Sequence, residues 1–390
     1  MADASRPLDR WRQALHRKSI DVVVADTERA GLQRKLGAGS LLILGIANIL
    51  GAGIYVMTGE AAASFAGPAV LLSFVLAALA CGFTGLCYAE LSSVIPVSGS
   101  AYSYCYVTLG EGCAWALGWM VILEYVLSAS AVAAGFAGYL TSLLGDVGVH
   151  VPAWLATSTI TALQQDGHTV LANSGGINLV AALAVLAAAC VLIAGVSQSA
   201  LVNAVLVVIK VGVLVSFIAV GARYVDSAHW QPFLPANEGG FAYGWPGVLR
   251  AAAMLFFAYL GFETVSMAAS ETRNPRRDVP FGILGSLVVC TLLYVAAGAV
   301  LTGIVPFREL GVPDPVALAV DRMGWPWFAV LIKIGALTGL GSVLLANGYG
   351  VSRVAVNIGR DGLLPGLFAH VHRTRRTPWL GNLTFGVIAA

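Results

Sequence analysis

Long apolar runs separated by short polar stretches constrain this chain more than any other feature of its sequence. Eight runs are long enough to cross a membrane as helices, and a ninth begins near position 378 and continues to Ala390. We place the eight at about 39–63, 68–90, 113–140, 177–197, 199–223, 245–270, 281–304 and 325–352. Charged residues make up only 11% of the chain, against about 25% in soluble domains. The sequence therefore predicts an all-α integral membrane protein.

Lys and Arg are distributed unevenly between the loops. Eight of the 22 precede position 36, and the next one along the chain is Lys210. Most later arginines gather in the loops 271–280 and 353–377, which lie on the N-terminal side if every run crosses the membrane. Because cytoplasmic loops carry an excess of Lys and Arg, this pattern predicts a cytoplasmic N-terminus.

Two of the apolar runs are interrupted near their middles. GIANILGAGIYVMTG at 45–59 holds three glycines before its last residue, and AYLGFETVSMA at 258–268 holds Gly261 and Glu263. Four ordinary spans lie between the two runs, so each interrupted span begins a five-helix unit. This pattern predicts a transporter of inverted repeats with its site at two broken helices. Close helix packing is the alternative explanation of the glycines, and it stays open for Gly45.

Other functional classes lack their signatures in this sequence. The six cysteines form no CxxC and no Cys/His cluster, so we expect neither disulfides nor a metal site. All six histidines lie outside the predicted spans, which argues against an intramembrane serine protease. The phosphate-binding pattern GxxxxGK[ST] is absent. We therefore expect no enzyme activity, no cofactor and no nucleic-acid partner.

Several motifs occur in a familiar order. They are LGIANILGAGIYVMTG (44–59), YAELSSVIPVSGSAYSYCYVTLGE (88–111), FFAYLGFETVSMAASETRNPRRDVP (256–280) and GRDGLLPGLFAHVHRTRRTPW (359–379). In these motifs the chain resembles the amino acid–polyamine–organocation (APC) superfamily, in its cationic amino acid transporter branch. The resemblance implies a leucine-transporter-like fold with helices 1 and 6 broken. Because that fold needs a tenth span, we expect the chain to be truncated after the start of helix 9.

This interpretation divides the chain into four regions. We expect a cytoplasmic tail at 1–38, helices 1–5 of the first repeat at 39–223, an extracellular loop at 224–244, and helices 6–9 of an incomplete second repeat at 245–390. The partners implied are an amino acid substrate, protons and the lipid bilayer of the plasma membrane.

The two interruptions offer backbone groups of opposite polarity, which suit the carboxylate and the ammonium group of an amino acid. Unpaired N–H groups after the first break, at Gly51, Ala52 and Gly53, would attract the carboxylate. Carbonyl groups at Ile49 and beside Phe257 would face the ammonium group.

The resemblance also implies that the aromatic ring at Phe257 closes over the bound substrate, with core packing as the alternative. Leu260 belongs to the same substrate-binding segment of helix 6.

Two acidic residues lie deep in the predicted spans, where ionisable side chains are functional by default. Glu263 would either contact the substrate ammonium or stabilise the break in helix 6. A protonated Glu263 that hydrogen-bonds a neighbouring helix is the alternative. We expect Glu124, on helix 3, to make a substrate-side contact or to take part in proton transfer.

Lys210 is the only Lys or Arg between positions 36 and 222. It lies about 20 Å from the end of its span, which is too deep for its side chain to reach water. Burial favours the neutral amine, so the side chain can take up and release a proton. The resemblance implies that this lysine stands where sodium-coupled relatives bind an ion. We therefore expect proton coupling, with a structural lysine paired to an acid as the alternative.

Asn347, on helix 8, corresponds to a position that lines the side-chain pocket in the family, where a polar residue would admit a polar or cationic side chain. By contrast, Lys333 lies near the end of its span and could reach the outer surface. The function we expect is secondary active, proton-coupled uptake of cationic or a broad range of L-amino acids. An amino acid/polyamine exchanger, or a membrane sensor or partner subunit that does not transport, remain alternatives.

Overall fold

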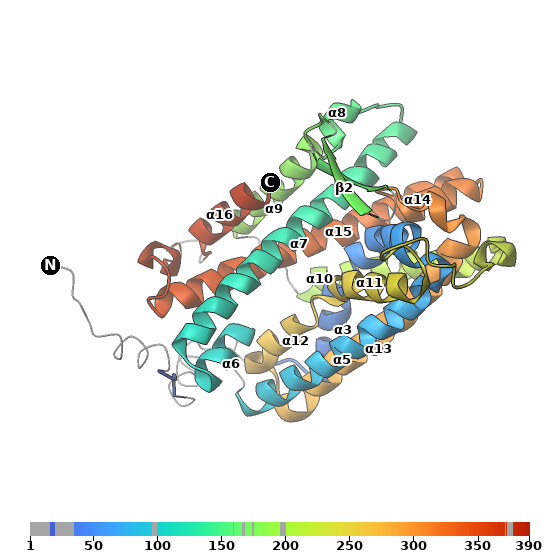
Figure 1. The fold of residues 1–390 in the computed structure, drawn as a ribbon. Helices are drawn as coiled ribbons and strands as arrows, with labels where there is room; N and C mark the ends of the chain where they lie inside the picture. The colour runs from blue at the N-terminus through green and yellow to red at the C-terminus, as the bar shows by residue number, and fades with distance from the viewer. Residues whose placement is uncertain are drawn as a thin grey trace.

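The computed structural model describes residues 16–19, 35–95, 100–158, 160–165, 168–173, 175–195, 200–370, 372 and 377–390. These residues form an elongated bundle of helices (Figure 1). Its longest members are α5 (Val70–Val94), α7 (Glu111–Asp146), α13 (Pro275–Ile304) and α15 (Pro326–Arg360). Helices suit such an apolar chain because a helix satisfies its own backbone hydrogen bonds where lipid offers no partners.

Six segments of the described chain are long and apolar enough to cross a membrane, by length and composition. They are Ala38–Val94, Glu111–Asp146, Val205–Tyr224, Gly244–Met267, Pro275–Ile304 and Pro326–Arg360. Two shorter apolar helices, α9 (Leu179–Ala194) and α16 (Trp379–Ala389), lie at the fourth and ninth predicted spans. Because Ala38–Val94 contains the first two predicted spans, each apolar run of the sequence corresponds to a helix or a broken helix.

The helices fall along the chain into two successive sets, as the predicted repeats require, and each set opens with a broken helix. The first repeat consists of α3 (Ala38–Ile49), η1 (Gly53–Met57), α4 (Thr58–Ala61), η2 (Ala62–Ala66), η3 (Gly67–Ala69), α5, α7, α9 and α10 (Ala200–Gly221). The second consists of α11 (Gly244–Phe256), η6 (Phe257–Tyr259), α12 (Glu263–Met267), η7 (Ala268–Glu271), α13, α15 and α16. The predicted breaks in helices 1 and 6 are confirmed.

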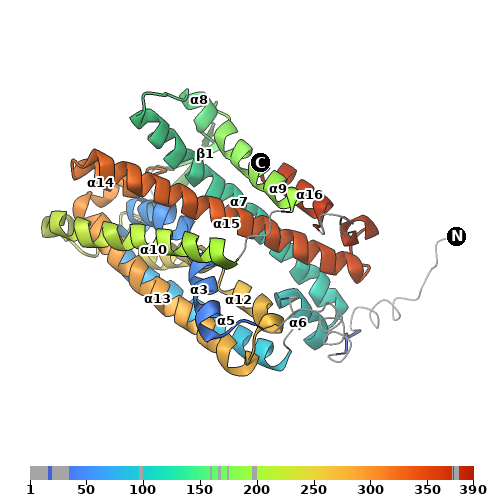
Figure 2. The same cartoon turned by 180° about the vertical axis from the view of Figure 1, so that it is seen from behind.

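Two groups of helices face each other across the middle of the bundle. The first group contains both broken helices together with α5 and α13, which pack closely on one another. The second contains α7 and α15, which pack along much of their lengths, with α9 and α16 beside them. Seen from behind, α10 crosses the bundle next to α15 and α13 (Figure 2). The two broken helices therefore lie against the long α7–α15 pair.

Short elements cover the two ends of the bundle. At one end lies α6 (Ser100–Thr108), and we call this the α6 end. At the opposite end, which we call the α14 end, lies α14 (Pro315–Arg322). The other elements at the α14 end are α8 (Ala153–Ala156), β1 (Ile160–Gln165), β2 (His168–Asn173), η4 (Ala222–Tyr224), η5 (Ser227–Trp230) and η8 (Phe307–Glu309), whereas η9 (Gly366–Ala369) follows α15 at the α6 end. The β1–β2 hairpin is an antiparallel pair that the sequence did not predict.

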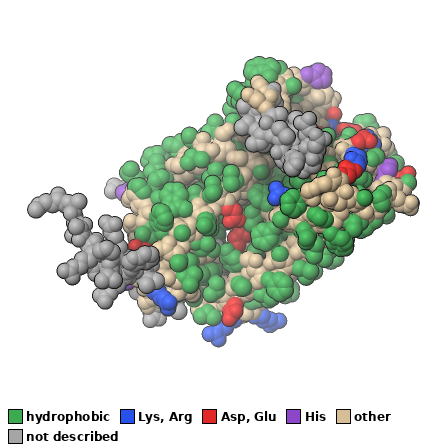
Figure 3. Space-filling view, viewed as in Figure 1, with side chains coloured by type: hydrophobic (Ala, Val, Ile, Leu, Met, Phe, Trp, Pro, Cys, Tyr) green, Lys and Arg blue, Asp and Glu red, His purple; other side chains and the backbone are tan. Residues whose placement is uncertain are grey.

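The surface of the bundle is largely apolar (Figure 3). Large side chains on its outward faces are strongly exposed, as at Phe83, Met120, Val208 and Leu292. An apolar surface of this extent suits a lipid environment. Figure 3 also shows acidic side chains in the middle of the apolar face, where a lipid-facing surface alone would not place them.

Candidate functional site

The break in the first helix begins where α3 ends at Ile49. Leu50 leaves the helix with a ψ of 102°, and a new half-helix, η1, starts at Gly53. The first N–H groups of a helix have no partner within it, so they point into the break. A Cβ on Gly51 would lie 2.5 Å from Val343 of α15, so glycine allows this close approach.

The break in helix 6 depends on Gly261. After α11 and η6, Leu260 adopts a ψ of 141° and Gly261 a φ of +115°, before α12 begins at Glu263. A Cβ on Gly261 would also lie 2.7 Å from the backbone carbon of Asn48. Glycine is therefore required both by the backbone conformation and by the close approach of the first broken helix.

The two breaks touch each other. A Cβ on Gly53 would lie 2.5 Å from the Cβ of Ala258. From α13, the Tyr294 hydroxyl lies 2.7 Å from the Ile49 carbonyl oxygen and 3.0 Å from that of Ala258. The hydroxyl has one hydrogen to donate, so these two carbonyl groups, one from each broken helix, compete for it.

The half-helices α3 and α12, on the α6 side of the breaks, are also joined. Asn48 donates its amide hydrogen to the Thr264 hydroxyl at 2.9 Å. Further toward the α6 end, Leu36 pairs with Thr272 in an isolated β-bridge. Backbone hydrogen bonds of 3.0 Å and 2.9 Å, from Leu36 N to Glu271 O and from Arg273 N to Leu36 O, hold that bridge.

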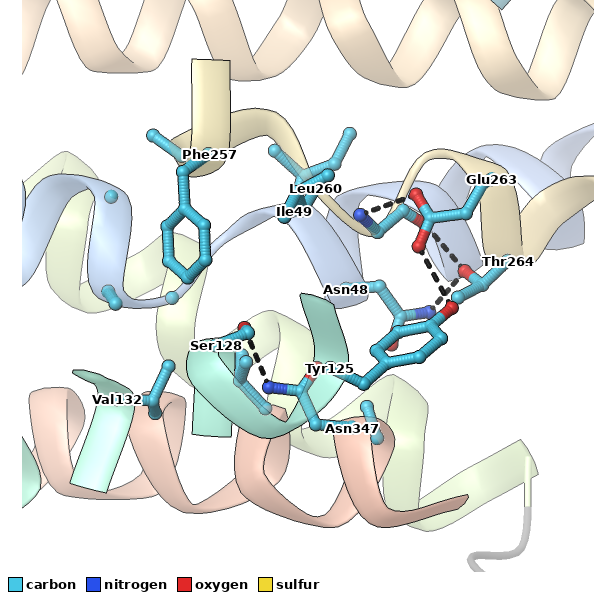
Figure 4. Close-up of a pocket in the computed structure, with 17 residues that line it drawn as sticks. Asn48, Ile49, Tyr125, Ser128, Val132, Phe257, Leu260, Glu263, Thr264 and Asn347 are labelled. Carbon is cyan, nitrogen blue, oxygen red and sulfur yellow. Dashed lines mark hydrogen bonds between the residues drawn. The ribbon is translucent and has the colours of Figure 1, made fainter. Parts of the chain in front are cut away.

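One cavity lies between the breaks and the α7–α15 pair (Figure 4). It is lined by Asn48, Ile49, Gly51, Ala52, Gly53, Tyr125, Ser128, Val132, Phe257, Ala258, Leu260, Gly261, Glu263, Thr264, Val343, Ala346 and Asn347. Every residue predicted to bind substrate, except Glu124, is in this lining. The Phe257 ring points into the cavity from the side of the broken helices. The structure brings these residues together, and their roles stay predictions.

Glu263 uses both of its oxygens within the protein. Oε2 accepts the Gly261 N–H at 2.8 Å, and Oε1 accepts the Tyr125 hydroxyl of α7 at 3.2 Å. The carboxyl group thus holds the backbone of the break, just before the half-helix that Glu263 begins, and ties it to α7. Of the two roles predicted for Glu263, this geometry favours stabilisation of the break, and the bond to α7 also fits the alternative of a protonated Glu263 that hydrogen-bonds a neighbouring helix.

Glu124 lines a second cavity that adjoins the first. The two cavities share Tyr125, Leu260 and Glu263 as walls. Aromatic side chains, among them Tyr88, surround Glu124 in the second cavity. Glu124 is half-buried and makes no hydrogen bond to any residue that the structure describes. Its carboxyl group is therefore available to a ligand.

Asn347 and Ser128 form a polar pair across the cavity floor, between α15 and α7. The Asn347 amide donates to the Ser128 hydroxyl at 2.8 Å, and both residues are buried. This bond leaves the amide oxygen of Asn347 available as an acceptor. The pair places polar groups opposite Phe257 (Figure 4).

Lys210 lies behind the first break rather than in the cavity. Its side chain is 1% exposed, and its ammonium group donates to the carbonyl oxygens of Ala47 at 2.9 Å and Leu50 at 3.2 Å. Among the residues that the structure describes, none offers Lys210 a carboxylate within 4.0 Å. The alternative of a structural lysine paired with an acid therefore has no support in this part of the chain.

Some residues of the site were missed by the sequence reasoning. Tyr294, Tyr125, Asn48, Thr264 and Ser128 all make hydrogen bonds at the breaks or in the cavity. One signal could have found the tyrosines: a Tyr in the middle of an apolar span needs a partner for its hydroxyl. The partner itself cannot be named from sequence.

Comparison with known proteins places this geometry in a family. The family model for amino acid permeases matches residues 36–390, almost the whole described chain. The chain belongs to the amino acid permease family. Its relatives are transporters rather than enzymes, and the chain is accordingly a multi-pass membrane protein of amino acid transport.

Several curated relatives cover nearly all of this chain. The branched-chain amino acid permease BcaP of Bacillus subtilis (strain 168) is 44% identical, over 96% of this chain and 77% of the relative. The methylthioribose transporter of the same organism is 42% identical with the same coverage. The vacuolar cationic amino acid transporter 4 of Arabidopsis thaliana is 34% identical, over 96% of this chain and 61% of the relative.

A solved structure supports the fold. The crystal structure of MhsT in complex with L-phenylalanine aligns with a TM-score of 0.63 over 92% of this chain and 78% of that one, at 17% identity. At that identity the likeness concerns the fold alone. The predicted resemblance to the APC superfamily is confirmed by the family match and by the cationic amino acid transporters among the relatives.

Proposed function

We propose that this amino acid permease is driven by protons and that Lys210 carries the coupling proton. The observation that supports this most directly is the position of the Lys210 ammonium, 2.9 Å and 3.2 Å from two carbonyl oxygens at the end of α3. The ammonium form donates to these carbonyls and so stabilises the end of the half-helix. Loss of the proton removes charge-assisted bonds from the break, so protonation and the shape of the site change together.

Uptake into proteoliposomes tests the coupling. We expect an imposed pH gradient without sodium to drive accumulation of substrate. We expect Lys210→Ala to reduce that accumulation at least about tenfold, because no other buried cation among the described residues contacts the break. Ser216→Ala is the matched control, since its hydroxyl bonds only to its own helix, at Val213 O. Uptake that requires sodium, or a Lys210→Ala variant with normal proton-driven accumulation, would show that the proposal is wrong.

We further propose that substrates are cationic or a broad range of L-amino acids. The backbone of the substrate would occupy the breaks at Gly51–Gly53 and Phe257. Its side chain would extend toward Asn347 or toward the Glu124 carboxyl group in the adjoining cavity. An unpaired carboxyl group among aromatic rings is a suitable host for a cationic side chain.

A competition panel tests the substrate range. Labelled substrate would be competed with arginine, lysine, leucine, alanine and methylthioribose. Methylthioribose is included because one relative is named for its transport. We expect Asn347→Met to weaken competition by arginine and lysine relative to leucine, and Ser342→Ala on the same helix to leave the ranking unchanged. An unaltered ranking in Asn347→Met would remove Asn347 as a side-chain selector. Exchange without net uptake would favour the exchanger, and binding without any flux would favour the sensor.

We also propose that the α6 end faces the cytoplasm, with the N-terminus, in the plasma membrane. The exposed arginines Arg273, Arg276, Arg277, Arg353 and Arg360 all lie at this end. Arg308 and Arg322, at the α14 end, are paired with Glu238 and Glu309. Arg223 of η4 is also exposed at the α14 end, but among the described arginines those without an acidic partner are more numerous at the α6 end, the side that the positive-inside rule then assigns to the cytoplasm.

A further inference from the structure

A second buried lysine lies far from the breaks, at the α14 end. Lys333 of α15 is 1% exposed. Its ammonium group donates to Asp146 Oδ2 at 2.7 Å and lies 3.7 Å from Asp321 Oδ2. Asp146 is the last residue of α7 and Asp321 lies in α14, so one side chain joins three elements.

Asp314, at the start of α14, adds a third carboxyl group to this environment. It is influenced electrostatically by Lys333 and Asp146. We call Lys333, Asp146, Asp314 and Asp321 the Lys333 cluster. With all four groups ionised, one positive charge faces three negative charges, so the cluster is short of positive charge.

No other described charge makes up this difference. On α14 itself, Arg322 is paired with Glu309 of η8. Among the elements that pack on α14, α13 carries no charged residue after Asp278, near its α6-side start. Of the others, α4 carries Glu60, which accepts a hydrogen bond from Ser64, and η1 carries only the phenol of Tyr55. The facing part of α7 adds the phenol of Tyr139, which lies near Asp314.

The segment that leads into α14 lies on the α14 side of the cavity, packed against α7 and the first broken helix. A Cβ on Gly138 of α7 would lie 2.5 Å from the Cβ of Pro313, and a Cβ on Gly59 of α4 would lie 2.5 Å from Leu310 O. The segment is thus seated between α7 and the outer half of the first broken helix. Val132, which lines the cavity, is six residues before Gly138 and so about 9 Å away along α7.

We propose that the Lys333 cluster holds α14 closed over the cavity, and that closure takes up protons from the α14 side. When α14 lifts, the three carboxyl groups, which are only partly exposed in the closed form, become fully hydrated. When α14 closes, the cluster must neutralise them with a single lysine and bound protons. The proposal rests on the proposed orientation, in which the α14 end is outside, and does not depend on which substrate is carried.

The direction of the pH effect follows from the aspartates of α14. Burial raises the pKa of Asp314 and of Asp321, although the positive charge of Lys333 opposes the change. A carboxyl group with a higher pKa in the closed form than in the open form binds its proton more tightly when closed. By linkage, a low pH outside favours the closed form. This effect is lost as the pH rises above the pKa that the aspartates have in the closed form.

Access to the cavity from outside is the measurement that tests this proposal. Val132→Cys would be labelled in proteoliposomes by a membrane-impermeant thiol reagent, and the labelled peptide would be quantified by mass spectrometry. Ser227→Cys, on the exposed η5 segment, is the reference for thiol reactivity at each pH. The ratio of the two labelling rates reports opening of α14 independently of transport.

We expect the Val132→Cys ratio to fall as the outer pH falls from about 7.5 to 5.5 across the range in which raised carboxyl pKa values lie. Lys333→Met should raise the ratio several-fold, about threefold or more, at the higher pH, because it removes the one positive charge among three partly exposed carboxylates. Lys333→Arg keeps the charge and should restore most of the closure. Asp314→Asn resembles the protonated carboxyl group, so it should lower the ratio and flatten its pH dependence.

The labelling ratios distinguish the ways in which this proposal could be wrong. A ratio that is unchanged in Lys333→Met and in Asp314→Asn, or that rises in acid, would overturn the proposal. If Lys333→Met does not fold, Asp314→Asn decides alone. If Ser227→Cys is labelled only by reagent enclosed in the vesicles, the proposed orientation is wrong. The labelling ratio measured with the enclosed reagent then tests whether the Lys333 cluster controls closure.

Discussion

Replacing Glu263 separates the two roles predicted for this acid. Glu263→Ala removes acceptors from the Gly261 N–H at 2.8 Å and from the Tyr125 hydroxyl at 3.2 Å. Hydrogen bonds to a charged group contribute about 1.5–3 kcal/mol each, so the two together amount to about 3–6 kcal/mol. Water entering the adjacent cavity can partly replace the carboxylate. We therefore expect a loss near the lower end, about 3 kcal/mol, in the free energy of unfolding.

Glu263→Gln is the conservative comparison. Its amide oxygen can still accept the Gly261 N–H, and the Tyr125 hydroxyl can turn to accept the new amide hydrogen. Only the charge is lost, so we expect a decrease of about 1–2 kcal/mol in the free energy of unfolding. If Glu263 mainly stabilises the break, this variant should keep its substrate affinity within a few-fold.

The assay is a denaturant titration in detergent micelles, with thermal unfolding as a cross-check and substrate binding measured in parallel. Glu124→Ala is the control, since Glu124 makes no hydrogen bond to a described residue and should cost less than about 1 kcal/mol. Equal losses in Glu263→Ala and Glu124→Ala would refute the reasoning. A Glu263→Gln variant of normal stability with affinity reduced tenfold or more, about 1.4 kcal/mol, would instead indicate a direct contact with the substrate ammonium.

Two further predictions concern the contact between the breaks. Tyr294→Phe removes the only hydroxyl shared by the two broken helices, and should cost about 1–3 kcal/mol of stability and slow transport, whereas Tyr224→Phe, at an exposed site, should do neither. Unaltered transport in Tyr294→Phe would contradict this expectation. Gly261→Ala should lose more stability than the about 1–2 kcal/mol that a non-glycine residue costs at a positive φ, because the added Cβ also meets the backbone of Asn48. Its melting temperature should be well below that of Gly82→Ala, whose added Cβ meets no described atom within 4 Å.

The positions of the breaks could be predicted because a glycine and a glutamate in the middle of an apolar span would destabilise an unbroken, lipid-facing helix. The same reasoning predicted the lining residues Ile49, Gly51, Ala52, Gly53 and Glu263, which come from the interrupted segments themselves, whereas Asn347 came from the resemblance and the lining residues of α7 were missed. Lys210 was also predictable as a buried lysine, because depth in a span follows from counting residues. These inferences depend on local sequence alone.

Contacts between distant segments could not be predicted in this way. The partners of Glu263, Asn48 and Tyr294 lie on other helices, and hydropathy does not indicate which faces meet. Lys333 shows the limit most clearly. Its place near the end of a span suggested that it reaches the surface, and this expectation is wrong, because Asp146, 187 residues earlier, and α14 bury it.

The double attachment between α3 and α12 restricts how the α6 end can open. The Asn48–Thr264 hydrogen bond and the Leu36–Thr272 bridge join these half-helices at both ends. Two points of attachment leave only a rotation about the line that joins them, and the close packing of Gly45 of α3 against Val265 of α12 opposes that rotation, so the pair moves as one rigid body. Probes placed on α3 and α12 should therefore keep a constant separation while both move relative to α7. The path on this side then opens by one tilt rather than by two independent ones.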